Sequence, residues 1–308
     1  MQAFMTTALE APRGSAWAAR LGSLVVAALI DEARLSPKPG LVDSRGSGAH
    51  HDLDLGLMER SALALGPAFV AMAEAGASAG APTRALRETL GRLGRDAEAR
   101  MLAATGGVNT HRGAVWALGL LAAAAAVQRR DGGPVPAAAV AETAGTIARH
   151  ADRGAPAFTH HRGERACRRF NVAGARGQAQ AGFPHVMRLG LPELARSRAR
   201  GDGETSARLN ALLAIISELD DTCVLSRGGR AGLTGIQHAA TRVLAEGGAA
   251  TLRGRRALRR LDQEAIAGNL SPGGAADLLA ATLFLDRIDH EPVSPPVHST
   301  DRGPHGKA

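Results

Sequence analysis

The chain of 308 residues contains no tyrosine, and only 3% of its residues are aromatic. Lysine is nearly absent as well, because Lys38 and Lys307 are the only lysines among 37 lysine and arginine residues. A formal net charge of +8 favours anionic partners, but proteins that bind single-stranded nucleic acid usually stack aromatic side chains on the bases. We therefore expect a basic surface that binds no nucleic acid, with arginines suited to the phosphates of a small substrate.

Cysteine is scarce, and no apolar run is long. Cys167 and Cys223 are too few for a disulfide scaffold or for a zinc site built from cysteines. The longest uncharged apolar run, Ala114 to Val127, is shorter than the roughly 20 residues that cross a bilayer. The apolar stretch 21–30 continues into two acidic residues rather than into a cleavage site. These absences predict a reduced, cytoplasmic protein with neither a membrane span nor a secretory signal.

Alanine, leucine, arginine and glutamate dominate the chain, and apolar residues recur with a helical period. No segment alternates long enough to predict a strand. The pattern predicts an all-α fold, with a single globular helical bundle domain over residues 1–288 and a disordered tail at 289–308. The segment 112–128 is apolar on every side, which is typical of a central helix. The expected helices cover residues 16–35, 57–75, 83–103, 112–128, 136–151, 204–223, 233–246, 255–268 and 275–288.

Glycine, proline, histidine and acidic residues gather between these helices. The first cluster, residues 36–54, holds Lys38 between two prolines that stiffen the backbone, which suits either a contact to phosphate or a solvated turn. It also contains His50, Asp52 and Asp54. These side chains suit a Mg²⁺ site or a general base, but an aspartate here is equally a candidate cap for the next helix.

The second cluster, residues 105–113, directly precedes the apolar central helix. Gly106 and Gly107 allow backbone N–H groups to approach an anion, and the helix N-terminus beside Arg112 favours negative charge. Asn109 is also a candidate N-cap. The loop is not a Walker A motif, because the Gly-Lys-Ser/Thr element is absent.

Two further clusters carry charge. The third places Arg176 among glycines at an expected helix start, where a guanidinium suits phosphate. In the fourth, a helical wheel puts Glu218 and Asp221 on one face beside Asp220, which fits Mg²⁺ held by carboxylates and substrate phosphates, or a solvated acidic face. Contacts to phosphate are expected from the residues that follow these acids in the chain, which are Ser226, Arg227, Gly228 and Gly229.

In this order and at these separations, the clusters resemble the triphosphoribosyl-dephospho-coenzyme A synthase family. The matching stretches are SPKPGLVD with SGAHHDLD, TGGVNTHRG, GARGQAQAGFP and DDTCVLSRGG, within a resemblance that runs from about Ala16 to Asp286. The last of these motifs and the ending LSPGGAADLLAATLFLD look more like the malonate decarboxylase branch than the citrate lyase branch. Leu53 stands where the family usually has methionine, and Gln178 stands where it usually has glutamate.

The resemblance implies an all-α transferase with ATP and 3′-dephospho-CoA as substrates. The 2′-hydroxyl of the coenzyme displaces adenine from C1 of the ATP ribose, and inversion by direct attack needs no covalent nucleophile. The family also implies downstream partners, a phosphoribosyl-dephospho-CoA transferase and the acyl carrier protein of malonate decarboxylase. No membrane partner is expected, and a homodimer is left open.

The residues then receive expected roles. Asp52 or Asp54 is the candidate base, and His50 or His111 orients the base or the ribose. Contacts to phosphate are expected from Lys38, Gly106, Gly107, Asn109, Arg112, Arg176, Ser226, Arg227, Gly228 and Gly229, and Mg²⁺ is expected on Glu218, Asp220 and Asp221. Two alternatives remain, a Mg²⁺-dependent nucleotide phosphohydrolase and a basic helical nucleic-acid-binding protein.

Overall fold

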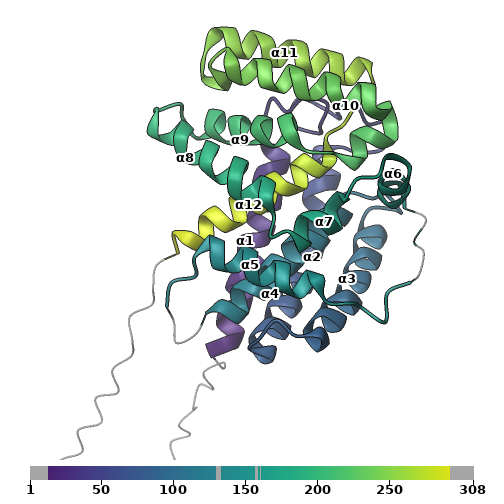
Figure 1. The fold of residues 1–308 in the computed structure, drawn as a ribbon, viewed down its shortest axis with the longest axis vertical. Coiled ribbons are helices and arrows are strands. Elements are labelled where there is room, and N and C mark those ends of the chain that lie inside the picture. Colours follow the sequence, from purple (N-terminus) through teal and green to yellow (C-terminus); the bar gives the residue numbers. More distant parts are fainter. Residues whose placement is uncertain (1–12, 130–132, 157–158, 160, 292–308) are drawn as a thin grey trace, which may run out of the picture.

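The computed structural model describes residues 13–129, 133–156, 159 and 161–291, and these form an all-helical fold (Figure 1). The described residues contain no strand, which confirms the all-α prediction. The helices are α1 (Arg13–Arg34), α2 (Leu55–Ala79), α3 (Arg84–Ala104), α4 (Arg112–Gln128), α5 (Ala137–Arg149), α6 (Arg162–Phe170), α7 (Gly174–Gln180), η1 (Val186–Gly190), α8 (Leu191–Ala199), α9 (Glu204–Glu218), α10 (Thr222–Ala245), η2 (Gly248–Ala250), α11 (Leu252–Ala267) and α12 (Gly273–Asp289).

Helix α4 is the centre of one half of the molecule. Every residue from Ala114 to Val127 except Trp116 is buried, as expected for a helix that is apolar on all sides. Helices α1, α2, α3, α5 and α12 all pack against it. The contact with α2 is close, since a Cβ on Gly76 would lie 2.2 Å from the Ala123 carbonyl oxygen. Glycine at this point therefore lets the two helices approach.

Helix α2 is long and apolar enough to cross a membrane by length and composition. Its buried residues include Leu65, Phe69 and Met72, and α1, α3 and α4 lie against it. This burial is that of a core helix in a helical bundle.

The helix expected at 204–223 is in fact two helices. Helix α9 ends at Glu218, Leu219 is extended, and Asp221 caps α10 by accepting hydrogen bonds from the Cys223 and Val224 N–H groups. The prediction that Glu218 and Asp221 share one helical face is therefore wrong, because a capping side chain interrupts the apolar period.

Two of the short helices were not predicted from the sequence. We expected a helix start near Arg176, where α7 lies, but not α6 or α8. Helices of nine residues or fewer depend on tertiary packing, and these two lack a long apolar stripe. Helix α12 ends at Asp289, and the tail expected after it falls mostly at 292–308, outside the described residues.

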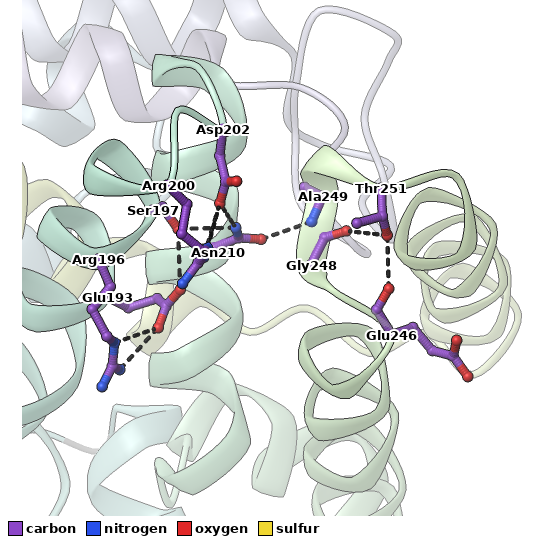
Figure 2. Close-up of polar contacts among 10 residues, drawn as sticks. All are labelled: Glu193, Arg196, Ser197, Arg200, Asp202, Asn210, Glu246, Gly248, Ala249 and Thr251. Atoms are coloured by element: carbon purple, nitrogen blue, oxygen red, sulfur yellow. Dashed lines mark hydrogen bonds and ion pairs between the residues drawn. The ribbon is translucent and has the colours of Figure 1, made fainter.

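Helices α8–α11 form the other half of the fold, and α12 joins the halves by packing on α1 and α4 as well as on α9 (Figure 1). A buried amide organises this second half (Figure 2). Asn210 is fully buried on α9, its Oδ1 accepts from the Ala249 N–H at 2.7 Å, and its Nδ2 donates to Ser197 Oγ at 3.0 Å. One side chain thereby links α8, α9 and η2.

Replacing this amide should destabilise the fold. Asn210→Ala leaves the buried Ala249 N–H without its acceptor, so we expect the free energy of unfolding to fall by about 2 kcal/mol. Urea unfolding followed by circular dichroism measures the loss. Gln263→Ala removes an exposed amide on α11 and should change stability by less than about 0.5 kcal/mol. Equal stability of the two variants would contradict the structural role of Asn210.

Candidate active site

Residues of the first, second and fourth clusters meet the stretch 270–277 where the N-termini of α4, α10 and α12 approach the loop 36–54. The Asp221 carboxylate joins two of these helix starts, because its Oδ1 accepts from Cys223 N and its Oδ2 accepts from Ala275 N at 2.9 Å. A Cβ on Gly113 of α4 would lie 2.0 Å from Asp277 Oδ2 of α12. Three helix N-termini in one place create a region that favours anions.

The loop 36–54 is fixed to the bundle by a buried ion pair. Lys38 donates from Nζ to Oε1 of Glu32 at 2.6 Å and to the Glu32 carbonyl oxygen at 2.6 Å, and both side chains are at least 96% buried. The ammonium of Lys38 is thus engaged by Glu32 rather than open to a phosphate. The phosphate contact that we expected from Lys38 is not what this structure shows.

Further along the loop, Asp43 and Arg45 hold the turn. Asp43 accepts from the Lys38 N–H at 2.9 Å, and Arg45 binds both Asp43 and Asp262. Arg45 and the two backbone N–H groups keep the pKa of Asp43 below its usual range, although burial acts in the opposite direction and is the largest single influence. The loop is therefore rigid and tied to α11.

His50 joins this loop to α10 and to the turn before α12. Its Nε2 lies 2.8 Å from Ser271 Oγ, and Arg227 Nη2 lies 3.2 Å from its Nδ1. A guanidinium only donates, so Nδ1 is the acceptor and Nε2–H donates to Ser271. Burial and the Arg227 charge lower the pKa of His50, which keeps the ring neutral. His50 is therefore a positioned hydrogen-bonding group.

The two aspartates of this cluster have different surroundings. Asp54 is the N-cap of α2 and accepts from the Leu57 N–H at 2.7 Å, which confirms the capping alternative. Asp52 is largely exposed, and its Oδ1 lies 3.6 Å from His50 Nδ1. Of the two, Asp52 is the carboxylate free to act as a base.

His111 is buried directly before α4. Its Nδ1 lies 2.9 Å from Ser61 Oγ, and its Nε2 has no hydrogen-bond partner among the described residues. Burial, aided by the nearby charge of Lys38, lowers the pKa of His111 to about 4. The imidazole is neutral at pH 7 and is enclosed by protein.

Asp277 near the start of α12 has the most strongly perturbed carboxyl group at this place. It is partly accessible, and the Ala114 N–H donates to it. Burial and the negative charges of Glu32 and Asp221 hold its pKa well above the usual range. Such a carboxyl holds its proton more strongly than an ordinary aspartate, which suits it to act as a general acid.

The three residues expected to bind Mg²⁺ are not brought together as one ligand set. The oxygens of Asp221 accept from backbone N–H groups of both α10 and α12, so this carboxylate is a structural cap. Asp220 and Glu218 are exposed. Within the described part of the chain, no group of three or more histidine, cysteine or acidic side chains is arranged to hold a metal ion.

The glycine-rich loop before α4 is open on its outer side. Gly106 and Gly107 have φ of +63° and +90°, and no atom would lie within 4 Å of a Cβ on either. The Gly107 N–H donates to the Leu102 carbonyl at 2.7 Å, so it is not free for an anion as expected. Asn109 Oδ1 accepts from the Arg112 N–H at 3.2 Å, although the N-cap residue of α4 is His111 and not Asn109 as considered. Arg112 itself binds Glu98 at 3.0 Å.

The remaining predicted phosphate ligands lie on α7 and α10. Arg176 is exposed and has no hydrogen bond within the described chain, whereas Arg227 donates to the Ala49 carbonyl and to Asn269 Oδ1. Ser226 Oγ donates to the Cys223 carbonyl. The two glycines that follow are needed for packing and for the shape of the helix. A Cβ on Gly228 would lie 2.4 Å from Leu270 Cδ2, and Gly229 interrupts α10 with φ of +60°.

Sequence reasoning missed Glu32 and Asp277 as members of the site. Glu32 lies within the first apolar helix, and Asp277 lies in the ending LSPGGAADLLAATLFLD, to which no catalytic role was assigned. Their proximity comes from tertiary packing of α1 against α12. The one available signal was the acid itself, placed in a predominantly apolar helix.

Known proteins resemble the chain over nearly its whole length. Residues 18–295 match the family model described as ATP:dephospho-CoA triphosphoribosyl transferase. A probable 2-(5''-triphosphoribosyl)-3'-dephosphocoenzyme-A synthase of Stutzerimonas stutzeri is 58% identical, covering 92% of this chain and 96% of the relative. The 2-(5''-triphosphoribosyl)-3'-dephosphocoenzyme-A synthase of Klebsiella pneumoniae is 58% identical, over 91% of this chain and 97% of that protein. No solved structure matches the chain.

Buried His111 should make stability depend on pH. An unfolded histidine titrates near 6.5, whereas His111 in the fold titrates near 4, so only the unfolded chain takes up a proton between these values. Stability should therefore fall as pH is lowered from 6.5 towards 4, with a contribution of up to about 3 kcal/mol from this residue.

Urea unfolding at pH 7 and pH 4.5 tests this effect. The difference between the two pH values should shrink in His111→Asn and stay unchanged in His238→Asn, which alters an exposed histidine on α10. An undiminished difference in His111→Asn would assign the acid sensitivity to other groups.

Proposed function

The chain belongs to the ATP:dephospho-CoA triphosphoribosyl transferase family and is a triphosphoribosyl-dephospho-CoA synthase, and we propose here how its residues carry out the transfer. The reaction moves the triphosphoribosyl group of ATP to dephospho-CoA and releases adenine. The transition state resembles an oxocarbenium ion, so it gains from a base for the incoming hydroxyl and a proton for the departing adenine.

Asp277 is the group proposed to protonate adenine. The observation that carries this assignment is the position of its carboxyl where α4, α10 and α12 meet, with burial and the charges of Glu32 and Asp221 favouring the protonated form. As the bond between ribose C1 and adenine breaks, the electron pair of that bond goes to adenine, and a proton from Asp277 neutralises the departing adenine. This role replaces none of the earlier expectations, because no residue had been assigned to it.

Asp52 is the proposed acceptor of the proton from the 2′-hydroxyl of dephospho-CoA. It is solvent-accessible and lies beside neutral His50, whose ring is fixed by Ser271 and Arg227. His50 therefore serves as a positioning residue for the base. Asp54 is excluded from this role here, because it caps α2.

The triphosphate is proposed to contact the arginines around the same helix N-termini. Arg176 offers an uncommitted guanidinium, and Arg112 and Arg227 retain donors beyond their protein partners. Guanidinium groups bind phosphate with two parallel hydrogen bonds, so they hold the polyphosphate in a defined orientation.

Exposed Asp220 and Glu218 fit a Mg²⁺ ion that is carried by the triphosphate. Mg²⁺ usually keeps several waters and takes one or two carboxylates together with substrate phosphates, so a dedicated cage of three protein carboxylates is not required. The ion would neutralise charge on the phosphates. Asp221 is not proposed as a ligand, since its oxygens are committed to backbone N–H groups.

We further propose that the enzyme acts in the cytoplasm and serves malonate decarboxylase, by way of a phosphoribosyl-dephospho-CoA transferase that loads the acyl carrier protein. Support comes from the form of the motif DDTCVLSRGG and of the ending LSPGGAADLLAATLFLD.

The activity is tested by incubating the purified protein with ATP, Mg²⁺ and dephospho-CoA. Free adenine is followed by chromatography, and the coenzyme product is weighed by mass spectrometry. We expect adenine release that depends on dephospho-CoA and a product that has gained the triphosphoribosyl group. Release of phosphate or ADP without adenine would point instead to the phosphohydrolase alternative.

The proposed acid predicts a specific pH profile. Asp277→Asn cannot donate the proton, so kcat should fall by about 100-fold or more. In the parent enzyme the rate should decline as pH rises through the raised pKa of Asp277, since the acid is lost there, and this limb should be missing from the variant. Rates across the pH range, measured as adenine release, give the comparison.

Asp289→Asn is the matched control, because it changes an exposed acid on the same helix and should keep the parent profile. Thermal unfolding should show Asp277→Asn to be at least as stable as the parent near pH 7, where the fold disfavours the ionised carboxyl. An unchanged pH limb in Asp277→Asn would remove this residue from the mechanism.

A further inference from the structure

A pocket of about 430 Å³ lies between α3 and α4, beside the proposed triphosphate site and not used by any step assigned so far. Its volume is in the range of about 300–1,000 Å³ that is typical of small-molecule sites. The floor is apolar and includes Met72, Leu90, Val115 and Leu120. The charged side chains of the lining are Arg87, Arg95, Glu98 and Asp152, and Thr159 and His161 are also part of it.

A glycine in the lining of this pocket faces open space. Gly94 lies inside α3 and lines the cavity, yet no atom would lie within 4 Å of a Cβ placed on it. Glycine in the middle of a helix costs about 0.5–1 kcal/mol relative to alanine, and nothing around Gly94 requires it for packing. The empty volume beside Gly94 is therefore a feature that a ligand would explain.

Arg87 offers hydrogen-bond donors at the edge of this space. It is 93% buried, its only hydrogen bond within the described chain runs from Nη1 to Asp152 at 3.4 Å, and its Nε has no partner. Asp152 is shared with Arg95, which lies at 3.0 Å. One carboxylate thus serves two guanidinium groups, and the positive charge and spare donors left over suit an acceptor or an anion.

The pocket is continuous with the arginines proposed for phosphate. Glu98 lines the pocket and also binds Arg112 at the start of α4. Trp116 lines it as well, and its Nε1 donates to the Ala175 carbonyl, next to Arg176. A ligand that fills the cavity can therefore extend directly into a cationic region.

The floor chemistry discriminates between the two substrates. Adenine needs acceptors and donors for its edge, but much of the lining is apolar, and the Arg87 guanidinium already lies 4.8 Å from the centre of the Trp116 ring, where a base would stack. The pantetheine arm of dephospho-CoA is a flexible chain with methyl groups, two amides and a terminal thiol, joined to a diphosphate. Such a chain matches an apolar cavity with donors at its edge and arginines beyond.

We propose that the pocket between α3 and α4 binds the pantetheine arm of dephospho-CoA and that Gly94 provides the room for it. The proposal rests on the proposed function, because it takes dephospho-CoA to be the acceptor. The coenzyme diphosphate then lies at the edge of the cationic region that also receives the ATP triphosphate, and the adenosine end carries its 2′-hydroxyl towards the reacting ribose. ATP has no part in this pocket.

Gly94→Leu tests the proposal by filling the cavity from a position that is sterically open. We expect KM for dephospho-CoA to rise by at least about tenfold, while KM for ATP stays within about twofold. Inhibition by 4′-phosphopantetheine, competitive with dephospho-CoA in the parent enzyme, should be lost in the variant. Gly235→Leu is the matched control, since this helical glycine on α10 is also open to a Cβ but lies outside the pocket, and it should keep the parent constants.

Two outcomes would overturn the assignment. A selective rise in KM for ATP would place the adenine of ATP in the pocket, and unchanged constants for both substrates would show that neither substrate uses it. Circular dichroism of both leucine variants establishes that they fold.

A binding measurement tests whether the pocket binds the pantetheine arm even if Gly94→Leu does not fold or the reaction itself is not observed. Trp17→Phe leaves Trp116 as the only tryptophan. In this variant 4′-phosphopantetheine should shift the fluorescence of Trp116, and ATP should not. Absence of adenine release by the parent enzyme would refute the function alone, whereas absence of this fluorescence response would refute the pocket assignment.

Discussion

The buried pair of Lys38 and Glu32 is the interaction on which the arrangement of the site depends. It fastens the end of the loop after α1 to α1 itself, and the remainder of that loop carries His50 and Asp52 to α10 and α12. Two charges out of water are tolerated only as partners, and removal of one partner from such a pair typically costs about 3–5 kcal/mol. The carboxylate of Glu32 also raises the pKa of Asp277, so one member of the pair that fixes the loop favours the protonated form of the neighbouring acid.

Around this pair the fold assembles positive and negative elements in a consistent way. The N-termini of α4, α10 and α12 point to one region, and arginines from α4, α7 and α10 stand at its edge. Polyphosphate suits the edge, whereas the interior collects carboxyl groups that the low dielectric keeps from ionising freely. A single site can thus hold an anionic substrate and retain a proton for its leaving group.

Much of the architecture could be predicted from the sequence, because long helices have long apolar patterns. The uniformly apolar run before Gln128 predicted the central helix, and the glycine-rich and acidic clusters correctly marked the loops that meet. The sequence did not show which polar groups form hydrogen bonds and ion pairs with other parts of the fold. Lys38 has the local pattern of an exposed ligand, but its partner lies in the preceding helix. Asp221 has the pattern of a metal ligand, but its oxygens accept from the nearby Cys223 and Val224 N–H groups and from Ala275, more than fifty residues away.

The environment of Asp277 was hidden for the same physical reason. Its protonation depends on burial and on charges from α1 and α10, which no window of neighbouring residues contains. Likewise, the cavity beside Gly94 exists only because α3, α4 and the segment at Asp152 leave a space between them. Local patterns predict elements and caps, whereas perturbed titration and empty volume are properties of the assembled tertiary structure.

The hydrogen bonds of Asp221 also determine when the site becomes ordered. Its two oxygens hold the first turns of α10 and α12 together, so Arg227 and Asp277 belong to one stiff unit whose relative positions are settled when the chain folds. The reacting groups then need little reordering when the substrates arrive, and the entropy of aligning them is lost during folding rather than during each turnover. A helix cap therefore also preorganises the proposed catalytic centre.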